Sequence, residues 1–258
     1  MSIPCSVYIV TVNCGQWLRQ TLDSVSDFAE VVILDSGSTD DTFDIAQQYP
    51  NTRIRHQDWQ GYAGQKALAL AECTQPWALN LDGDEELSVE LKKEIEAVIA
   101  ADSAAEDHVD GLITPIRDAF MGRLCSEHTR LHAKIRFFRR TSGSYDLKIA
   151  VHEAVQVQGS VRRATGQIYH YGEQTIAIKV DKNNNYSSLK AREKAARGKR
   201  ANLLKLVLVM PLTFIKCYFL RRDFLNGWQG FIGSMINAFY AFMKEAKLYE
   251  LTRDAGKQ

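Results

Sequence analysis

This 258-residue sequence shows no large excess of one charge, no CxxC pair and no visible secretory signal. Lysine plus arginine total 32 and aspartate plus glutamate total 31, so the formal net charge is only +1. This balance argues against a strongly basic nucleic-acid-binding protein. The five cysteines, at positions 5, 14, 73, 125 and 217, include no CxxC pair, which favours reduced thiols in the cytoplasm.

Other signals are absent too. Residues 1–4 offer no basic n-region and no long apolar segment follows them, so no secretory signal is expected. No internal repeat or low-complexity segment is visible, and no GxGxxG follows a strand, which disfavours a dinucleotide-binding dehydrogenase. The apolar fraction of 45% is ordinary for a globular protein. The length allows one substantial core, or one domain with an appendage.

Apolar runs of strand length alternate with helical periodicity in the first hundred residues. Strands are predicted at 6–12, 31–34, 52–56 and 77–81, and helices at 16–28, 40–48, 62–73 and 88–101. This alternation predicts a mostly parallel, Rossmann-like α/β sheet with crossover helices. After a polar loop, the segments 111–117, 133–140 and 150–158 are predicted as strands without intervening helices. They indicate antiparallel additions to the same sheet, around an acceptor pocket.

The last third of the sequence changes to charged and then apolar helical patterns. A charged helix is expected over 179–200, followed by apolar segments at 203–220 and 224–243 with Arg221 and Arg222 between them. The last segment is long enough to cross a bilayer, but three glycines and three amide side chains within it argue against a span. Apolar surface beside basic residues favours a helical hairpin docked on anionic lipid. A buried hairpin or a homodimer face is the alternative.

The segment WALNLDGDEEL, residues 77–87, places an apolar run directly before four carboxylates. Open α/β sheets bind ligands at the carboxyl ends of their strands, so Asp82 and Asp84 are expected at a rim of the sheet. Carboxylates packed this closely resist full ionisation unless a cation joins them. Mg²⁺ and Mn²⁺ bind through such oxygens together with substrate phosphates, and Gly83 allows close backbone approach to a ligand. The segment predicts a metal–diphosphate clamp, with a solvated turn as the alternative.

Three motifs in this order, TVN, LDSGSTD and LNLDGDEE, resemble those of the family 2 glycosyltransferases, which are inverting enzymes of the GT-A fold. The small bacterial lipopolysaccharide inner-core β-1,4-glucosyltransferases of the WaaE/KdtX type are the most similar members. The resemblance includes GYAGQKALAL, KIRFFRR, AVHEAV, IYHY and the C-terminal hairpin, so it covers nearly the whole chain. It implies a catalytic domain over 1–172, with a nucleotide-sugar half at 1–101 and an acceptor half at 102–172. A membrane-associating helical region at 173–258 follows.

The resemblance also implies roles for individual residues. Lys66 would supply a compact positive charge near the diphosphate, although an ordinary helix lysine looks the same in sequence. Asp35 would contact the base or ribose, with a helix cap as the alternative, and Glu85 would bind through water or orient the donor sugar. The implied nucleotide-sugar-binding residues are Thr11, Asn13, Asp35, Ser38, Lys66 and Asp82, and the implied ligands of Mg²⁺ or Mn²⁺ are Asp82, Asp84 and His170.

An inverting transfer needs one general base to deprotonate the acceptor hydroxyl. The resemblance assigns that role to Glu153, with an ordinary surface glutamate as the alternative. Asp118 and Glu127 are the next candidates if Glu153 is not the base. The acceptor-side residues would be His152, Arg136 and Arg139, with the arginines facing anionic groups. Alternating strand geometry puts Phe137 on the opposite face from Arg136. The alternative for one of the two arginines is therefore that its side chain only extends along the surface to reach solvent and does not bind the acceptor.

The sequence departs from the family in reading DGD where relatives more often have a central alanine, and it lacks the QxxRW motif of processive synthases. The resemblance therefore implies transfer of a single sugar, with UDP-glucose as the first donor to test. The acceptor would be a lipopolysaccharide core or similar lipid-linked saccharide at the cytoplasmic face of the inner membrane. A nucleotidyltransferase is one alternative, although its usual Gly-rich basic loop is replaced by residues 13–16. A non-catalytic, membrane-bound, cation-binding scaffold is the other, and nucleoside diphosphate binding would distinguish it.

Overall fold

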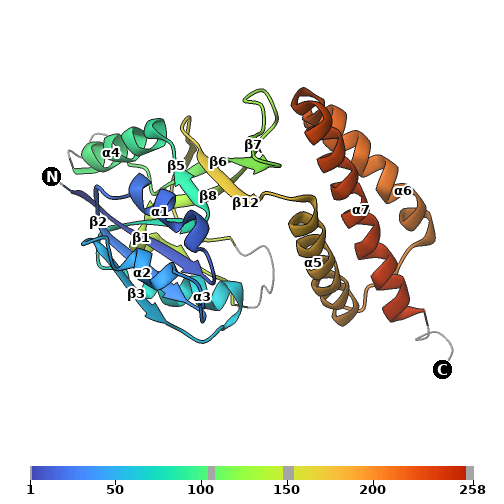
Figure 1. Ribbon diagram of the computed structural model, residues 1–258, viewed down its shortest axis with the longest axis horizontal. Helices are drawn as coiled ribbons and strands as arrows, with labels where there is room; N and C mark the ends of the chain where they lie inside the picture. The colour runs from blue at the N-terminus through green and yellow to red at the C-terminus, as the bar shows by residue number, and fades with distance from the viewer. Residues whose placement is uncertain (1, 104–107, 148–153, 254–258) are drawn as a thin grey trace. The chain divides into compact units, whose positions relative to one another are not determined.

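The computed structural model describes residues 2–103, 108–147 and 154–253, and the chain divides into two compact units (Figure 1). The first unit comprises residues 1–117 and 132–172, and the second comprises residues 118–131 and 173–258. Residues 118–131, expected in the acceptor half, group with the C-terminal helices. The reason is hydrogen bonding: the Ser126 N–H donates to Asn226 Oδ1 at 2.6 Å, and the Arg130 N–H donates to the Arg221 carbonyl at 2.9 Å.

The first half of the chain follows the predicted alternation closely. Its elements are β1 (Ile3–Thr11), α1 (Gly15–Ser24), β2 (Phe28–Asp35), α2 (Thr42–Ala46), β3 (Thr52–His56), α3 (Gly61–Ala71), β4 (Trp77–Asp82), β5 (Glu85–Leu87) and α4 (Val89–Ser103). Then come β6 (Gly111–Phe120), β7 (Arg123–Leu124), β8 (His132–Arg139), β9 (Gly143–Ser144), β10 (Gln156–Val157), β11 (Val161–Arg163) and β12 (Ile168–Glu173). The strand expected over 150–158 is described only from residue 154, and there β10 pairs with β9.

One sheet organises the first unit, with the strand order β3-β2-β1-β4-β8-β6-β12-β5. Neighbouring strands among β3, β2, β1 and β4 pair in parallel, whereas β8 is antiparallel to both β4 and β6. The predicted parallel α/β sheet with antiparallel additions is therefore confirmed. β5 follows β4 after two residues yet pairs with β12 at the far end of the order. The sheet must curl back, and the turn at Gly83 and Asp84 lies where it does so.

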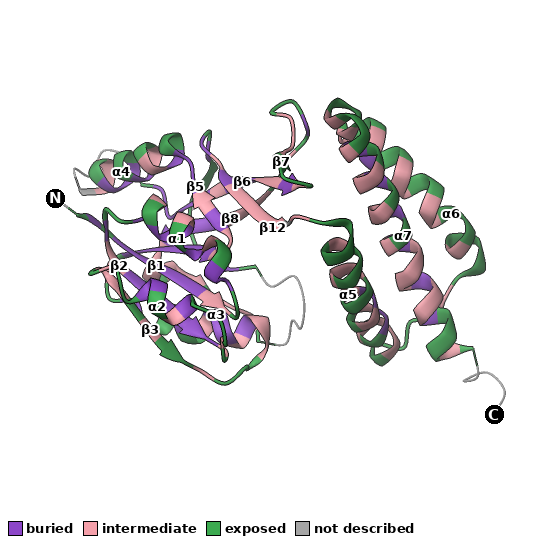
Figure 2. Cartoon of the chain, in the orientation of Figure 1, coloured by how far each residue is buried: buried purple, intermediate pink, exposed green. Residues whose placement is uncertain are grey.

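Helices cover both faces of this sheet because side chains along a strand alternate between the faces. Val7 and Ile9 of β1 point into a core shared with Leu18 and Leu22 of α1, which also includes residues of α2 and α4. Tyr8, between them, points into a second core with residues of α3. Figure 2 shows the central strands largely buried. Replacing Leu18, which is fully buried, by alanine would cost about 2–5 kcal/mol of stability.

The second unit is built on three helices, α5 (Ile176–Ala196), α6 (Leu203–Ile215) and α7 (Gly227–Thr252). Asn202 caps α6 by accepting the Lys205 N–H at 3.1 Å, and the helix runs through Pro211 into a π-helical turn, Lys216–Leu220. A 3₁₀ turn, Asp223–Asn226, leads into α7. The buried face of α7 carries small residues at helical spacing, which permits close packing against α5 and α6: Gly230, Ser234, Ala238 and Ala241.

Candidate active site

The acidic turn between β4 and β5 is closed from inside by Glu85. This side chain is 2% exposed, and its Oε2 accepts the Asp82 N–H at 2.8 Å. Its other oxygen, Oε1, accepts from Arg136 Nη2 at 2.5 Å. Glu85 therefore braces the turn and is directed into the protein, away from the donor-sugar contact considered from the sequence.

Two cations hold the carboxylate of Asp82. Lys66 Nζ lies 3.1 Å from Oδ1, and Arg136 Nη2 lies 3.3 Å from Oδ2. Burial by itself raises the pKa of Asp82, but the positive charges of Lys66 and Arg136 outweigh it and bring the pKa well below its usual range. Asp82 is therefore ionised at neutral pH, and it holds the Lys66 ammonium beside the acidic turn.

Asp84 lies beside His170, which comes from β12 opposite Glu85. His170 Nε2 is 3.5 Å from Asp84 Oδ2. Gly172 makes room for this pair, since a Cβ there would stand 2.0 Å from Asp84 Oδ2 and 3.1 Å from His170 Nε2. The Tyr171 N–H also donates to the Asp84 carbonyl at 2.9 Å, so β12 fixes both the backbone and the carboxylate of Asp84.

This pair fits a divalent cation that takes further oxygens from its substrate. Among the residues that the structure describes, no three His, Cys, Asp or Glu side chains converge into a metal-ligating group. Mg²⁺ and Mn²⁺ are commonly bound by one or two protein carboxylates plus substrate phosphates and water. Asp84 with His170 meets that requirement. Asp82 is the less suitable ligand because each of its oxygens already faces a cation.

Helix α1 holds the other side of the turn. The Thr21 hydroxyl, 1% exposed, donates to the Gly83 carbonyl at 3.0 Å. A Cβ at Gly83 would lie 2.8 Å from Cys14 Sγ and 2.9 Å from Thr11 Oγ1. The close approach expected at this glycine is therefore made to the end of β1 and the start of α1.

The TVN and LDSGSTD motifs meet because Thr11 and Asp35 are in register at the ends of β1 and β2. Asp35 is fully buried, and its Oδ2 accepts the N–H groups of Gly37 and Ser38, both at 2.8 Å. The Ser38 hydroxyl bonds to Asp35 Oδ1 and accepts the Asn13 N–H at 2.7 Å. Asp35 thus shapes the loop with both oxygens. Helix α2 begins at Thr42 rather than near residue 40, and the Thr42 N–H donates to Asp40 Oδ1 at 3.1 Å.

The two arginines expected on the acceptor side, Arg136 and Arg139, lie at different places in the first unit. Arg136 is only 4% exposed and is committed to the acidic turn and to Asn80. Arg139 lies 4.7 Å over the Trp77 ring, at the opposite end of β4 from Asp82, and pairs with Asp102 and Asp110. His152 and Glu153 lie outside the described residues.

Two positioning contacts were not predicted from the sequence. Gln65, which is fully buried, donates from Nε2 to the Ser36 hydroxyl and the Gln57 carbonyl, both at 2.9 Å, and so ties together the loops beside Lys66. Trp17 stacks on Tyr171 with ring centroids 5.3 Å apart. The amide at position 65 in an Ala/Leu-rich helix was a usable signal for the first contact, because buried polar groups need partners.

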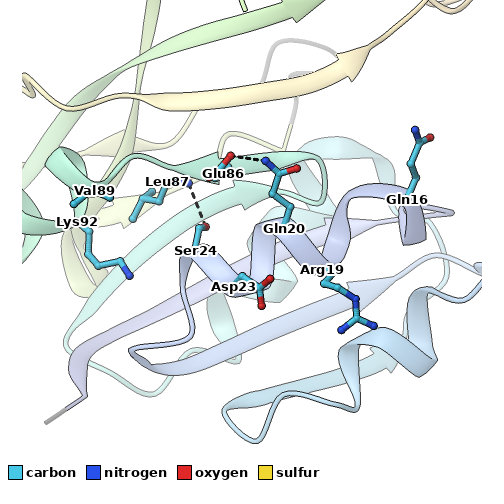
Figure 3. Close-up of a pocket in the computed structure, with 9 residues that line it drawn as sticks. All are labelled: Gln16, Arg19, Gln20, Asp23, Ser24, Glu86, Leu87, Val89 and Lys92. Atoms are coloured by element: carbon cyan, nitrogen blue, oxygen red, sulfur yellow. Dashed lines mark hydrogen bonds between the residues drawn. The ribbon is translucent and has the colours of Figure 1, made fainter. Parts of the chain in front are cut away.

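A cavity of about 580 Å³ lies along α1 and β5 (Figure 3). Figure 3 shows Gln20 bonded to Glu86 and the Leu87 N–H bonded to Ser24. Gln20 Nε2 donates to Glu86 Oε2 at 2.6 Å, and the Leu87 N–H donates to Ser24 Oγ at 3.2 Å. The remaining lining residues are Gln16, Arg19, Asp23, Val89 and Lys92. None of the residues to which the resemblance gives a role lines this cavity, although Glu86 of the acidic segment does.

Comparison with known proteins identifies the class to which this fold and site belong. The model of the family described as "Glycosyl transferase family 2" matches residues 6–105. The lipopolysaccharide core biosynthesis glycosyltransferase LpsC of Rhizobium meliloti is 36% identical over 254 residues, which cover 96% of this chain and 93% of LpsC. An uncharacterized glycosyltransferase of Rickettsia felis is 34% identical over 253 residues, and the alignment covers 95% of this chain and 89% of the relative.

Among solved structures, S. aureus TarS 1–349 in complex with UDP aligns with a TM-score of 0.50 and 16% identity, over 99% of this chain and 92% of that one. This likeness supports the predicted GT-A fold. The near-full-length relation to LpsC, together with the family match, confirms the resemblance predicted from the motifs: the chain belongs to glycosyl transferase family 2 and is a glycosyltransferase.

Proposed function

We propose that this enzyme transfers a single sugar, with inversion, from a nucleoside-diphosphate sugar to a lipopolysaccharide core acceptor, with the help of Mg²⁺ or Mn²⁺. The observation that carries the proposal is the Asp84–His170 pair, 3.5 Å apart, next to the Lys66–Asp82 ion pair. It gathers a carboxylate, an imidazole and an ammonium at the carboxyl end of a parallel strand. Open α/β folds bind their ligands at that end.

Asp84 and His170 would hold the divalent metal. When bound, such a metal offsets the negative charge that develops on a departing diphosphate. Lys66, only 6% exposed, adds a fixed positive charge beside the same place. Asp82 keeps the Lys66 ammonium in position and remains available at its edge to a ribose hydroxyl.

The nucleoside would lie against the loops after β1 and β2, beside Thr11, Asn13 and Ser38. Asp35 would act through the loop conformation that it holds, since its oxygens already accept three hydrogen bonds from Gly37 and Ser38. UDP-glucose is the donor we would test first, on the strength of the family resemblance.

Glu153 is our proposed general base, on the strength of the family resemblance alone. A carboxylate there would take the proton of the acceptor hydroxyl as its oxygen attacks the anomeric carbon and the diphosphate leaves. His152, beside it, would contact the acceptor. The lipopolysaccharide core as the acceptor is supported by the name of LpsC, which covers almost the same length of chain.

The second unit presents an apolar surface that suits the cytoplasmic face of the inner membrane. Exposed apolar side chains recur every three or four residues, so each helix carries them on one face. We call these the apolar stripes: Leu204, Val207, Leu208, Leu212 and Ile215 on α6 with Phe219 in the π-helical turn that continues it, and Trp228, Phe231, Met235 and Phe239 on α7. Trp228, which is 80% exposed, has the amphipathic ring typical of membrane interfaces.

The charges favour docking in the plane of the membrane over crossing it. Leu203–Leu220 is long and apolar enough to cross a bilayer by length and composition, and only 6% of it is buried. However, exposed basic residues border both of its ends, Lys199 and Arg200 before it and Lys216 and Arg222 at and after its last turn. Basic residues gather on the cytoplasmic side, so both ends belong at one membrane surface.

A product assay tests the proposal. The purified chain is incubated with UDP-, GDP- or ADP-sugars, an extracted lipopolysaccharide core acceptor, and Mn²⁺ or EDTA. We expect one added sugar per acceptor by mass spectrometry, an inverted anomeric configuration by NMR, and no product with EDTA. Retention of configuration, transfer that persists in EDTA, or donor binding without any transfer would each overturn the corresponding part of the proposal.

A further inference from the structure

Arg136 is the most deeply buried cation beside the acidic turn, and its guanidinium joins three residues of that turn and strand. Nη1 donates to Asn80 Oδ1 at 2.7 Å, and Nη2 contacts both Glu85 Oε1 at 2.5 Å and Asp82 Oδ2 at 3.3 Å. Because its side chain is 5% exposed, a bulky anionic acceptor group has little access to it. The acceptor role expected from the sequence therefore does not suit this residue.

The contacts form a closed ring. Arg136 binds the Glu85 carboxylate, the second Glu85 oxygen accepts the Asp82 N–H at 2.8 Å, and the Asp82 carboxylate returns to Arg136. Lys66 holds the remaining oxygen of Asp82. The planar fork of arginine suits such multiple contacts, whereas a lysine ammonium is a point charge.

We propose that Arg136 is a positioning residue, which sets the conformation of the turn from Asp82 to Glu85 and thereby the placement of Asp84 for the metal and diphosphate. The inference rests on the proposed function of that turn. A purely stabilising role explains the ring less well, since a buried ion pair can often be replaced by apolar residues without loss of stability. The Nε of Arg136 is also buried without a hydrogen-bond partner among the described residues. The orientation of the guanidinium therefore follows from its contacts with the turn, and it leaves one of the guanidinium's own donors unpaired.

Arg139 provides a matched control on the same strand. It also pairs with two carboxylates, those of Asp102 and Asp110, but at the other end of β4. Arg136→Gln and Arg139→Gln each remove one paired arginine from β8. A double variant, Arg136→Gln with Glu85→Gln, avoids leaving Glu85 buried without its partner if the single variant folds poorly.

The first measurement is hydrogen exchange of the peptide covering residues 80–87, without donor or metal. We expect faster exchange in Arg136→Gln and in the double variant, an intermediate rate in Arg136→Lys, and the wild-type rate in Arg139→Gln. Unchanged exchange in both Arg136→Gln and the double variant, or an equal increase in Arg139→Gln, would overturn the positioning role. This readout stands even if the chain binds no nucleotide.

The second measurement is calorimetry of Mn²⁺ binding in the presence of UDP. We expect a loss of about 10- to 100-fold in Mn²⁺ affinity for Arg136→Gln, the range seen when residues supporting metal ligands are replaced. Arg136→Lys should recover part of the loss, and Arg139→Gln should bind as the wild type does. Absence of binding by the wild type would instead count against the proposed function, and the exchange data would then decide on Arg136.

Discussion

His170 and Asp84 meet across the antiparallel pairing of β12 with β5, with 3.5 Å between Nε2 and Oδ2. Asp84 follows the fourth strand and His170 lies far along the chain, so only the curl of the sheet brings them together. A carboxylate and an imidazole at this distance can share one divalent cation, provided that a substrate supplies further oxygens.

Replacing Asp84 by asparagine should abolish the metal dependence of UDP binding. The amide keeps the shape of the side chain but removes the charge that attracts the cation. We expect calorimetry of the wild type to show UDP affinity that falls in EDTA, and that of Asp84→Asn to show one weak affinity in both conditions. The melting temperature should stay near the wild-type value. Equal UDP affinity of the wild type with and without EDTA would refute the metal role.

Gly172→Ala tests whether the position of Asp84 matters. The new Cβ would stand 2.0 Å from Asp84 Oδ2, so the carboxylate must move. We expect Mn²⁺ affinity to fall about tenfold or more, as happens when support of a metal ligand is disturbed. Gly111→Ala is the control, because its Cβ is also crowded, 3.0 Å from the Phe137 carbonyl, but lies away from the turn. A normal Mn²⁺ affinity in Gly172→Ala would argue against Asp84 as a ligand.

Glu153→Gln should bind the donor normally but transfer poorly. A carboxamide cannot take the acceptor proton, and loss of a general base typically lowers the rate by about 10²- to 10⁴-fold. Steady-state kinetics with a competent acceptor would show the fall in kcat, and calorimetry would show unchanged UDP binding. A kcat near the wild-type value would move the base elsewhere, with Asp118 or Glu127 as the next candidates.

The second unit should lose stability in acid through Glu245. Burial raises the pKa of this carboxyl, but Lys194 and Lys205 outweigh it and leave the pKa below the usual value. Because the pKa of Glu245 is lower in the folded state, its stabilising contribution to the free energy of unfolding is complete above the unfolded-state pKa of about 4.3. It is lost as pH falls through the lower folded value. We expect Glu245→Gln to lower the free energy of unfolding at pH 7 by about 1–3 kcal/mol, and the difference from wild type to shrink below pH 4.

Glu193→Gln is the matched control for that experiment, since Glu193 pairs with Lys190 and Arg197 on the same helix, near the surface. Such pairs contribute about 0–1 kcal/mol. Thermal unfolding from pH 7 to pH 3 compares the three proteins. If Glu245→Gln were as stable as the wild type at pH 7, the buried carboxylate would have no net stabilising role.

Local patterns predicted much of this fold, and contacts between distant residues account for what they missed. The strand from Thr52 to His56 was predicted to the residue, because apolar periodicity and turn residues act over a few positions. The acidic turn was placed correctly at the end of β4 for the same reason. From the sequence, Arg136 and Arg139 had the same predicted acceptor-side role. In the structure, Arg136 lies under the turn and Arg139 lies at the opposite end of β4.

That difference depends on pairing between distant strands. The register that sets Trp77 opposite Arg139 decides which arginine reaches Asp82, and no local pattern encodes it. Glu85 illustrates the same limit. Within DGDEE it looks like one more exposed carboxylate, but its burial follows from the pairing of β5 with β12, more than eighty residues later.

The apolar stripes should bind the enzyme to anionic membranes without a span. We expect flotation with vesicles that contain anionic lipid, weaker flotation with neutral vesicles, and release by high salt or carbonate. Each basic residue near an anionic surface contributes about 1 kcal/mol, which salt screens. Val207→Asp with Trp228→Asp should abolish flotation, because both side chains, 71% and 80% exposed, would enter the interface as charges.

Leu189→Asp is the control for these substitutions. Leu189 is 41% exposed but lies on α5, outside the stripes, so its replacement should leave flotation unchanged. Replacing Lys199 and Arg200 by glutamine should weaken binding to anionic vesicles only, which separates the charge contribution from the apolar one. Binding to neutral vesicles that survives salt and carbonate would instead indicate an integral span through Leu203–Leu220. If the wild type did not float with any vesicle, the stripes would have to be covered by a second copy of the chain, and sedimentation would then show a dimer that Val207→Asp dissociates.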